Sequence, residues 1–298
     1  MIFPYRLNYA SKGIKLDLEQ ILYDLIEKAS TQLPEDTEKA LEDAYRKETN
    51  HIAKLQLKTI LENIKIARKE KLPICQDTGT LIFFVDVGID FPYKHEIQSS
   101  IHRAVKIATE KIPLRPNCVD PFTEKNTGNI GEKIPWIEWN LIEGKDCKIT
   151  VLPKGGGSEN CSTLKMFNPS DGIERIEDFV VNHIIECGGK PCPPVIVGIG
   201  IGGGADIAMK LAKRSLLRSV GERSKNRTLA DLEERLLKRI NETGIGPMGL
   251  GGKTTALDVH IEYASRHPAS FPVAVSIQCW ANRRASVIIK GDGEVEWI

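Results

Sequence analysis

The chain has 298 residues, with 41 Lys and Arg against 40 Asp and Glu, so its formal net charge at pH 7 is +1. Its 41% hydrophobic and 27% charged residues are typical of a soluble globular protein with a substantial core, which excludes a disordered chain or a collagen-like repeat. A near-neutral chain has no overall field that attracts nucleic acid or an anionic membrane, so we expect neither partner.

The first 70 residues are expected to form a helical region. Residues 16–29 are amphipathic, and a second long segment follows Pro34, with apolar residues at helical spacing as far as Ile64. No segment approaches the roughly 18 consecutive apolar residues of a spanning helix, and the first residues contain no run long enough for a secretory signal. We therefore expect a cytoplasmic protein.

From Lys71 the pattern changes to short apolar runs separated by Gly, Pro and Asn. Runs rich in β-branched and aromatic residues predict strands at 80–88, 134–142, 147–153, 193–200, 256–264 and 271–279. Amphipathic segments predict helices at 96–112, 173–187, 205–219 and 229–242. The order lacks a clean βαβ period, so we expect a mixed α/β fold that is not doubly wound. We expect one domain over residues 1–298, with the helical region 1–70 packed on a mixed-sheet core, 71–298, that carries glycine-rich loops.

The seven cysteines are widely spread, and in a reducing compartment such a set indicates thiols rather than a disulfide framework. Three of them, Cys75, Cys192 and Cys279, open or close an apolar run beside Pro or polar residues. The other four are expected to be thiols that pack as small hydrophobic residues: Cys118, Cys147, Cys161 and Cys187. Spacing alone leaves open whether the first three form a metal site, because the chain has no C-x-x-C pair and no zinc-type His pattern.

A glycine fingerprint, G-x-G-x-x-G, follows the predicted strand at 193–200 and is formed by Gly198, Gly200 and Gly203. A dinucleotide site also needs a second strand that ends in an acidic residue about 20 positions later. Residues 221–236 instead have the pattern of a turn and a helix. We therefore favour glycines that let the backbone approach a neighbouring group closely.

Two other short motifs are incomplete. The segment 249–255 ends like a phosphate-binding loop, but Pro247 occupies the position of the first glycine and removes an N–H donor. Residues 77–79 spell the D-T-G of aspartic proteases, yet the chain has no second copy to supply the paired carboxylate. A nucleotide-binding or regulatory module built on the glycine-rich loops is kept as a distant alternative.

Longer segments carry a more specific signal. They are ICQDTGT, NTGNIGEK, PKGGGSEN, KPCPPVIVGIGIGG, GLGGKTTALDVHIE and SRHPASFPVAVSIQCWANRRA, in this order. Together they resemble the alpha portion of the class I iron–sulfur hydro-lyases, which comprise fumarate hydratase and L(+)-tartrate dehydratase. The resemblance covers roughly Tyr5 to Lys290.

The resemblance implies a [4Fe-4S] cluster bound by Cys75, Cys192 and Cys279. Three thiolates leave one iron without a protein ligand, so that iron can act as a Lewis acid on a substrate hydroxyl and carboxylate. The implied reaction is the reversible hydration of fumarate to malate.

The resemblance also implies roles for residues outside the cluster. Gln76 and Asp77 correspond to a substrate contact and the catalytic carboxylate. Arg115 corresponds to the arginine that binds a substrate carboxylate, a task suited to its planar guanidinium. His267 corresponds to the histidine that handles protons with that aspartate. Gly157 corresponds to a backbone contact near the substrate.

Single-chain members of this family continue into a C-terminal domain that supplies further arginines, a lysine and a threonine base, and this sequence stops at Ile298. We therefore expect the alpha subunit of a two-subunit enzyme, which needs a separate beta subunit and assembles as alpha2beta2. On the overall resemblance we expect fumarate as the substrate, with L(+)-tartrate as the alternative. The alternative stays open because only a contact that recognises the extra hydroxyl group would discriminate between the two.

Overall fold

The computed structural model describes residues 6–8 and 16–298. The chain divides into two compact units: unit 1 contains Met1–Leu33, Ile66–Lys154 and Arg283–Ile298, and unit 2 contains Pro34–Lys65 and Gly155–Asn282. Each unit combines helices with a sheet, which confirms the mixed α/β fold class. The single domain over residues 1–298 stays a prediction. In the described ranges, none of the helices has the length and apolar character needed to cross a membrane.

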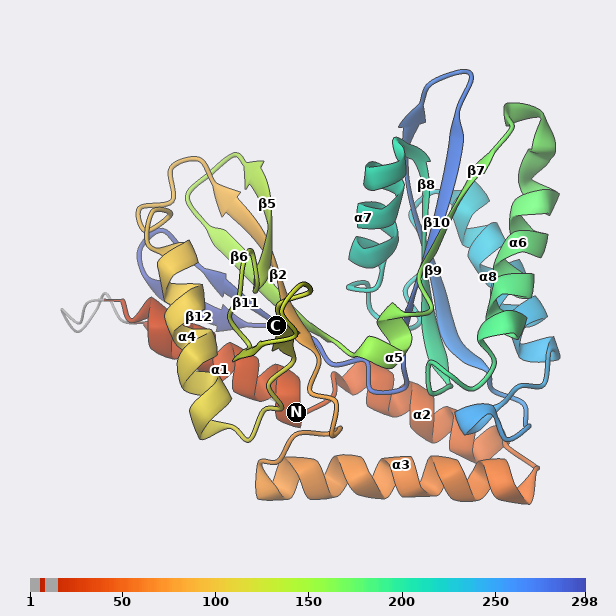
Figure 1. Cartoon of the computed structure of the whole chain (residues 1–298), viewed down its shortest axis with the longest axis horizontal. Helices are drawn as coiled ribbons and strands as arrows, with labels where there is room; N and C mark the ends of the chain where they lie inside the picture. The colour runs from red at the N-terminus through yellow and green to blue at the C-terminus, as the bar shows by residue number, and fades with distance from the viewer. Residues whose placement is uncertain (1–5, 9–15) are drawn as a thin grey trace. The chain divides into compact units, whose positions relative to one another are not determined.

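Unit 1 is built on a six-stranded sheet in the order β1-β12-β11-β6-β2-β5 (Figure 1). Its strands are β1 (Arg6–Asn8), β2 (Thr80–Gly88), β5 (Trp136–Ile142), β6 (Cys147–Lys154), β11 (Ala285–Ile289) and β12 (Glu294–Trp297). Strand β2 pairs antiparallel with β6 and parallel with β5. A small sheet of β3 (Cys118–Val119) and β4 (Asn126–Gly128) belongs to the same unit. Strand β1 lies within residues 1–70, which were expected to be helical.

Helices α1 (Leu18–Thr31) and α4 (Ile97–Lys111) provide the helical part of the core of unit 1. Helix α1 begins after Asp17, whose carboxylate caps it by accepting a hydrogen bond from the Gln20 N–H at 3.0 Å. The apolar faces of both helices pack with the inward-facing residues of the sheet, such as Phe83 on β2. Alternation of side chains along β2 places Leu81, Phe83 and Val85 on this face, and the residues between them are buried on the other face.

Unit 2 contains a four-stranded sheet in the order β7-β10-β8-β9. Its strands are β7 (Thr163–Phe167), β8 (Val195–Gly203), β9 (Ala256–Arg266) and β10 (Phe271–Gln278). Helices α6 (Gly172–Cys187) and α8 (Arg227–Glu242) cover one face, and α7 (Ala205–Ser215) covers the other (Figure 1). Short helical turns complete the unit: α5 (Gly156–Glu159), η2 (Pro169–Asp171) and η3 (Pro247–Gly249).

The N-terminal segments are helical as expected, but the long segment after Pro34 is divided into two helices by residues 48–50. Helix α2 (Glu35–Lys47) starts directly after Pro34, and α3 (His51–Glu70) follows it. The division between the units falls within α3 and before α2. The helical segments expected before residue 70 therefore form, but they do not belong to one separate region.

The glycines of β8 serve packing. A Cβ atom at Gly200 would overlap the carbonyl oxygen of Ala208, and one at Gly198 would overlap that of Ala212, so both glycines let α7 lie directly on the strand. The phosphate-loop pattern at 249–255 leads into strand β9 at Ala256 and not into a helix N-terminus. The fingerprint strand does lead into α7, but Gly198 and Gly200 lie within β8 and pair with β10 and β9 instead of forming a turn at the helix N-terminus. Neither motif therefore forms the glycine-rich turn of a nucleotide site.

Candidate active site

The segment that contains Cys75, Gln76 and Asp77 forms a loop in unit 1 before strand β2. The Asp77 carboxylate accepts hydrogen bonds from the Gly79 N–H at 3.0 Å and from Asn117 Nδ2 at 3.4 Å. Gly79 has a φ of +80°, a conformation that a side chain would strain. The carboxylate thus has a fixed position, while Gln76 is exposed on the same loop.

Arg115 lies on the adjoining loop of unit 1. Thr78 Oγ1, which is buried, accepts a hydrogen bond from the Arg115 N–H at 3.0 Å. The Arg115 side chain is exposed, and its guanidinium has no ion-pair partner within residues 16–298. The structure therefore brings together Asp77 and Arg115, and it leaves the cation available to an acidic ligand.

Two residues that sequence reasoning missed hold these loops in place. Asn129 is buried; its Nδ2 donates to the Arg115 carbonyl at 3.2 Å, and its Oδ1 accepts from the Asn117 N–H at 3.1 Å. Arg283 is also buried, and its Nη1 donates to the Asp77 carbonyl at 2.8 Å. Asn129 lies in the NTGNIGEK segment and Arg283 in CWANRRA, so the motifs were visible but the individual roles were not.

Cys192 and Cys279 lie at the same end of the sheet in unit 2. Ile196 of β8 pairs with Gln278 of β10, so the residues before β8 and after β10 are neighbours. The Trp280 N–H donates to the Cys192 carbonyl at 3.2 Å. Cys192 has a φ of +56°, in the left-handed region that non-glycine residues rarely adopt, which is often found at functional sites.

Gly157 belongs to the same end of unit 2. It lies in the short turn α5, and a Cβ atom there would be 3.3 Å from the carbonyl oxygen of Lys190, on the loop that leads to Cys192. Next to it, Ser158 Oγ lies 3.5 Å from Gln278 Oε1, the residue before Cys279. Three predicted residues therefore converge in unit 2, with an exposed glycine backbone beside two cysteines.

The glycine-rich loop at 246–252 supports the Cys192 loop. The Met248 N–H donates to the Pro193 carbonyl at 2.8 Å. Gly249 has a φ of +74°, and a Cβ atom there would lie 2.6 Å from Gly189 Cα. The glycines that resembled a phosphate loop thus allow close contact between two backbones.

His267 lies elsewhere in unit 2. It follows β9 and precedes β10, at the end of the sheet where β8 finishes, whereas Cys192 and Cys279 lie where β8 begins. A nine-residue strand spans about 30 Å at the usual rise per residue. His267 is exposed, and its Nδ1 accepts a hydrogen bond from the Ala269 N–H at 3.1 Å. This structure does not bring His267 to the cysteines of its own unit.

The environments of the cysteines differ, and no disulfide joins any of the seven, all of which are among the described residues. Burial and the nearby Asp86 raise the pKa of Cys147 to about 12. Burial and a hydrogen bond with Cys161 raise the pKa of Cys187 to about 12. Such thiols stay protonated near neutral pH and are poor metal ligands. The predicted ligands Cys75, Cys192 and Cys279 are instead half-buried at loop ends, and Cys118 on β3 is half-buried as well.

The predicted cysteines fit an iron–sulfur cluster in donor type and in charge. Thiolates are the usual ligands of such clusters. Arg283 supplies a buried positive charge beside the Cys75 loop, and its Nε has no hydrogen-bond partner among the described residues. A buried cation with an unsatisfied donor is expected next to an anionic group. Across residues 6–8 and 16–298, no group of three His, Cys, Asp or Glu residues is arranged to hold a metal ion.

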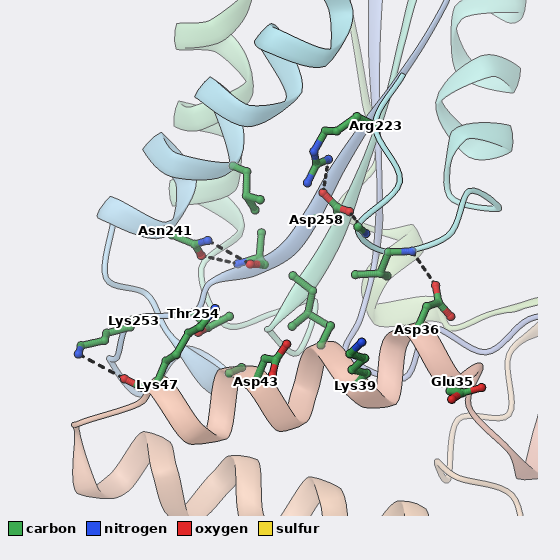
Figure 2. Close-up of a pocket in the computed structure, with 17 residues that line it drawn as sticks. Glu35, Asp36, Lys39, Asp43, Lys47, Arg223, Asn241, Lys253, Thr254 and Asp258 are labelled. Carbon is green, nitrogen blue, oxygen red and sulfur yellow. Dashed lines mark hydrogen bonds and ion pairs between the residues drawn. The ribbon is translucent and has the colours of Figure 1, made fainter. Parts of the chain in front are cut away.

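A separate pocket of about 810 Å³ lies in unit 2 between α2, α8 and the start of β9. Figure 2 shows hydrogen bonds among the residues that line it. Arg223 donates to Asp258 at 2.5 Å, and the Val220 N–H donates to Asp36 at 2.6 Å. None of the predicted site residues lines this pocket, and we assign it no part in the reaction.

Residues 19–288 match the family described as fumarate hydratase (Fumerase). A protein of Methanocaldococcus jannaschii, named "Putative L(+)-tartrate dehydratase subunit alpha", is 50% identical over 94% of this chain and 100% of its own length. The L(+)-tartrate dehydratase subunit alpha proteins of Escherichia coli (strain K12) and Shigella sonnei are each 40% identical over 92% of this chain and 91% of their own length.

Proposed function

The chain belongs to the fumarate hydratase family of hydro-lyases, and we propose that it is the alpha subunit of a [4Fe-4S] enzyme that reversibly hydrates fumarate to malate with a separate beta subunit. The observation that carries the proposal is the pair of adjoining loops in unit 1. They present Cys75, the fixed Asp77 carboxylate and the exposed Arg115 cation on neighbouring segments. Residues 1–298 act as one catalytic domain in this proposal.

In the proposal, Cys75, Cys192 and Cys279 hold the cluster. When bound, the cluster supplies a Lewis-acidic iron that weakens the C–O bond of the leaving hydroxyl. The buried Arg283 offsets part of the negative charge that three thiolates bring. The buried thiols Cys147 and Cys187 take no part because their raised pKa keeps them neutral.

The other residues bind and orient a four-carbon dicarboxylate. Arg115 pairs with one carboxylate through its planar guanidinium. The Gln76 amide and the Gly157 N–H donate hydrogen bonds to substrate oxygens, and donors fixed before the reaction stabilise charge that develops on a carboxylate. Asp77 holds or moves a proton at its carboxylate, which is oriented by Gly79 and Asn117.

The names of the relatives favour L(+)-tartrate as a second candidate substrate, because the matched M. jannaschii and E. coli proteins are named as L(+)-tartrate dehydratase subunits. The two substrates differ in hydroxyl groups, and a site that hydrogen-bonds a hydroxyl discriminates strongly against a substrate that lacks it. Those names also support a partner subunit for this chain.

The test is anaerobic assembly of the chain with its candidate beta subunit, followed by assays with malate, fumarate and L(+)-tartrate. We expect turnover of one dicarboxylate pair by the assembled enzyme and little or none by the chain alone. Full activity without a partner would contradict the two-subunit proposal. Activity on tartrate with none on fumarate or malate would select the second candidate.

The role of His267 needs its own test, because in unit 2 it lies far from Cys192 and Cys279. His267→Asn is expected to lower kcat and to change the pH profile if this residue handles a proton. An unchanged kcat and pH profile would remove His267 from the mechanism and leave the rest of the proposal in place.

A further inference from the structure

Strand β5 is an edge strand of the sheet in unit 1. It ends the strand order, and in the described part of the chain it pairs only with β2 (Figure 1). Proteins usually protect such edges with Lys, Pro or a bulge, because the unpaired N–H and C=O groups attract another strand. The strand WIEWNLI contains no Lys or Pro, and Glu138 is its only charged residue.

The side chains of this edge are unusually apolar for a surface. Trp136 and Trp139 are each 45% exposed, Leu141 is 66% exposed and Ile142 is 40% exposed. Trp139 and Leu141 share a face of the strand with Ile137, which packs against the core of unit 1. The apolar face of the sheet therefore extends onto exposed side chains of its last strand, where contact with water is unfavourable.

We propose that β5 pairs antiparallel with β5 of a second copy of this chain, with the two-fold axis at Trp139, so that the two six-stranded sheets become continuous. A two-fold axis perpendicular to a sheet keeps every side chain on its own face. Because side chains alternate along a strand, such an axis must lie where one residue is directly opposite the same residue of the second copy.

The sequence of β5 is self-complementary about Trp139. In this register Ile137 faces Leu141 of the second copy, Trp136 faces Ile142, and Glu138 faces Asn140. Apolar cross-strand pairs and a carboxylate opposite an amide stabilise adjacent strands. Asn140 Nδ2 already donates to Asp86 at 2.8 Å, and its second hydrogen can reach the facing carboxylate.

Neighbouring registers are poorer. An axis at Glu138 would place two carboxylates opposite each other, which is unfavourable. An axis at Asn140 would place Glu138 opposite Ile142 and leave Trp136 beyond the end of the facing strand. Only the axis at Trp139 pairs every residue of Trp136–Ile142 with a residue of the second strand.

The direct test is a disulfide at the axis. Trp139→Cys is introduced into the full chain, which is oxidised mildly and analysed by mass spectrometry for a link between the two substituted positions. Residues directly opposite across an antiparallel pair have Cα atoms about 4.5–5.5 Å apart, within disulfide reach. In Leu141→Cys, the matched control, the two positions would be about 14 Å apart along the strands, beyond that reach. We expect the link in the first variant only.

The oligomeric state provides the second measurement. We expect the wild-type chain to have twice the 33.1 kDa mass of the monomer by light scattering. Trp139→Lys is expected to be a folded monomer, because it places two cations opposite each other at an exposed position, whereas Trp139→Phe stays dimeric. A monomeric wild type, an unchanged dimer in Trp139→Lys, or links in both cysteine variants would overturn the proposal. A Trp139→Lys chain that still self-associates but no longer binds the beta subunit would also overturn it, because β5 would then be the binding surface for that subunit.

Discussion

The hydroxyl of Thr78 is the contact whose removal is most informative. It accepts hydrogen bonds from the Arg115 N–H at 3.0 Å and from Asn117 Nδ2 at 3.3 Å, and Thr78 itself is buried. Thr78→Val keeps the shape of the side chain and removes the acceptor. Each donor left without a partner costs roughly 1–3 kcal/mol. Since Arg115 and Asn117 are reached by water, the lower end applies, and we expect a loss of about 2 kcal/mol in the free energy of unfolding.

Urea unfolding of the full chain measures this loss, and Thr78→Ser is the matched control because it keeps the hydroxyl. In the assembled enzyme we also expect KM to rise by about tenfold in Thr78→Val, since the Arg115 loop is no longer held beside Asp77 and a tenfold change corresponds to about 1.4 kcal/mol. A Thr78→Val protein as stable as the wild type would refute the hydrogen-bond reasoning. A lower kcat with unchanged KM would refute the positioning role.

Three further changes test other parts of the structure. Gly200→Ala places a Cβ atom on the Ala208 carbonyl oxygen and is expected to destabilise the chain by about 3 kcal/mol in urea unfolding; a neutral effect would mean that α7 does not lie on β8 as described. Burial raises the pKa of Cys147 to about 12, so the stabilising contribution of this thiol is complete below its unfolded pKa near 9 and decreases as the pH rises through 9 toward 12. Between pH 8 and pH 10 this contribution decreases by about 1.4 kcal/mol, and Cys147→Ser should lose that pH dependence. Burial alone would raise the pKa of Asp258, but the hydrogen bond with His260 and the charge of Arg223 hold it below its usual value. Asp258→Asn is expected to cost about 3 kcal/mol because it removes the close carboxylate from Arg223 and leaves that cation only Glu233, at 3.9 Å; thermal unfolding that matches the wild type would contradict this.

The main elements follow from local sequence patterns. The apolar runs at 80–88 and 271–279 are rich in β-branched and aromatic residues, and they became β2 and β10 with nearly the expected bounds. Helices α4 and α8 follow from their apolar periodicity in the same way. The strands missed by the sequence analysis are short, such as β7 and β12. Four or five residues with several exposed positions carry too weak an alternation to be recognised.

The convergence of the site residues depends on pairing between distant strands. Cys192 and Cys279 are neighbours because β8 pairs with β10, and nothing in either segment specifies that pairing. The same pairing places His267 at the other end of the sheet, because the connection from β9 to β10 passes the end of β8. Motif resemblance identified these residues, but it could not report their distances.

The supporting residues were harder to predict. Asn129 and Arg283 act through hydrogen bonds to backbone atoms of other loops. An Asn in a turn and an Arg after a strand are usually solvent-exposed, so composition gives no reason to expect that both are buried. Their roles can be recognised only from their contacts with the loops at 75–79 and 115–117 in the folded chain.

In the proposed enzyme, three cysteines hold a cluster without which there is no turnover. The most direct measurement is iron and acid-labile sulfide per chain, made anaerobically on the assembled enzyme, together with activity. Cys75→Ser, Cys192→Ser and Cys279→Ser should each lose the cluster and the activity, while Cys118→Ser and Cys147→Ser should keep both. Equal behaviour of all five variants, or an active enzyme without iron, would contradict the account.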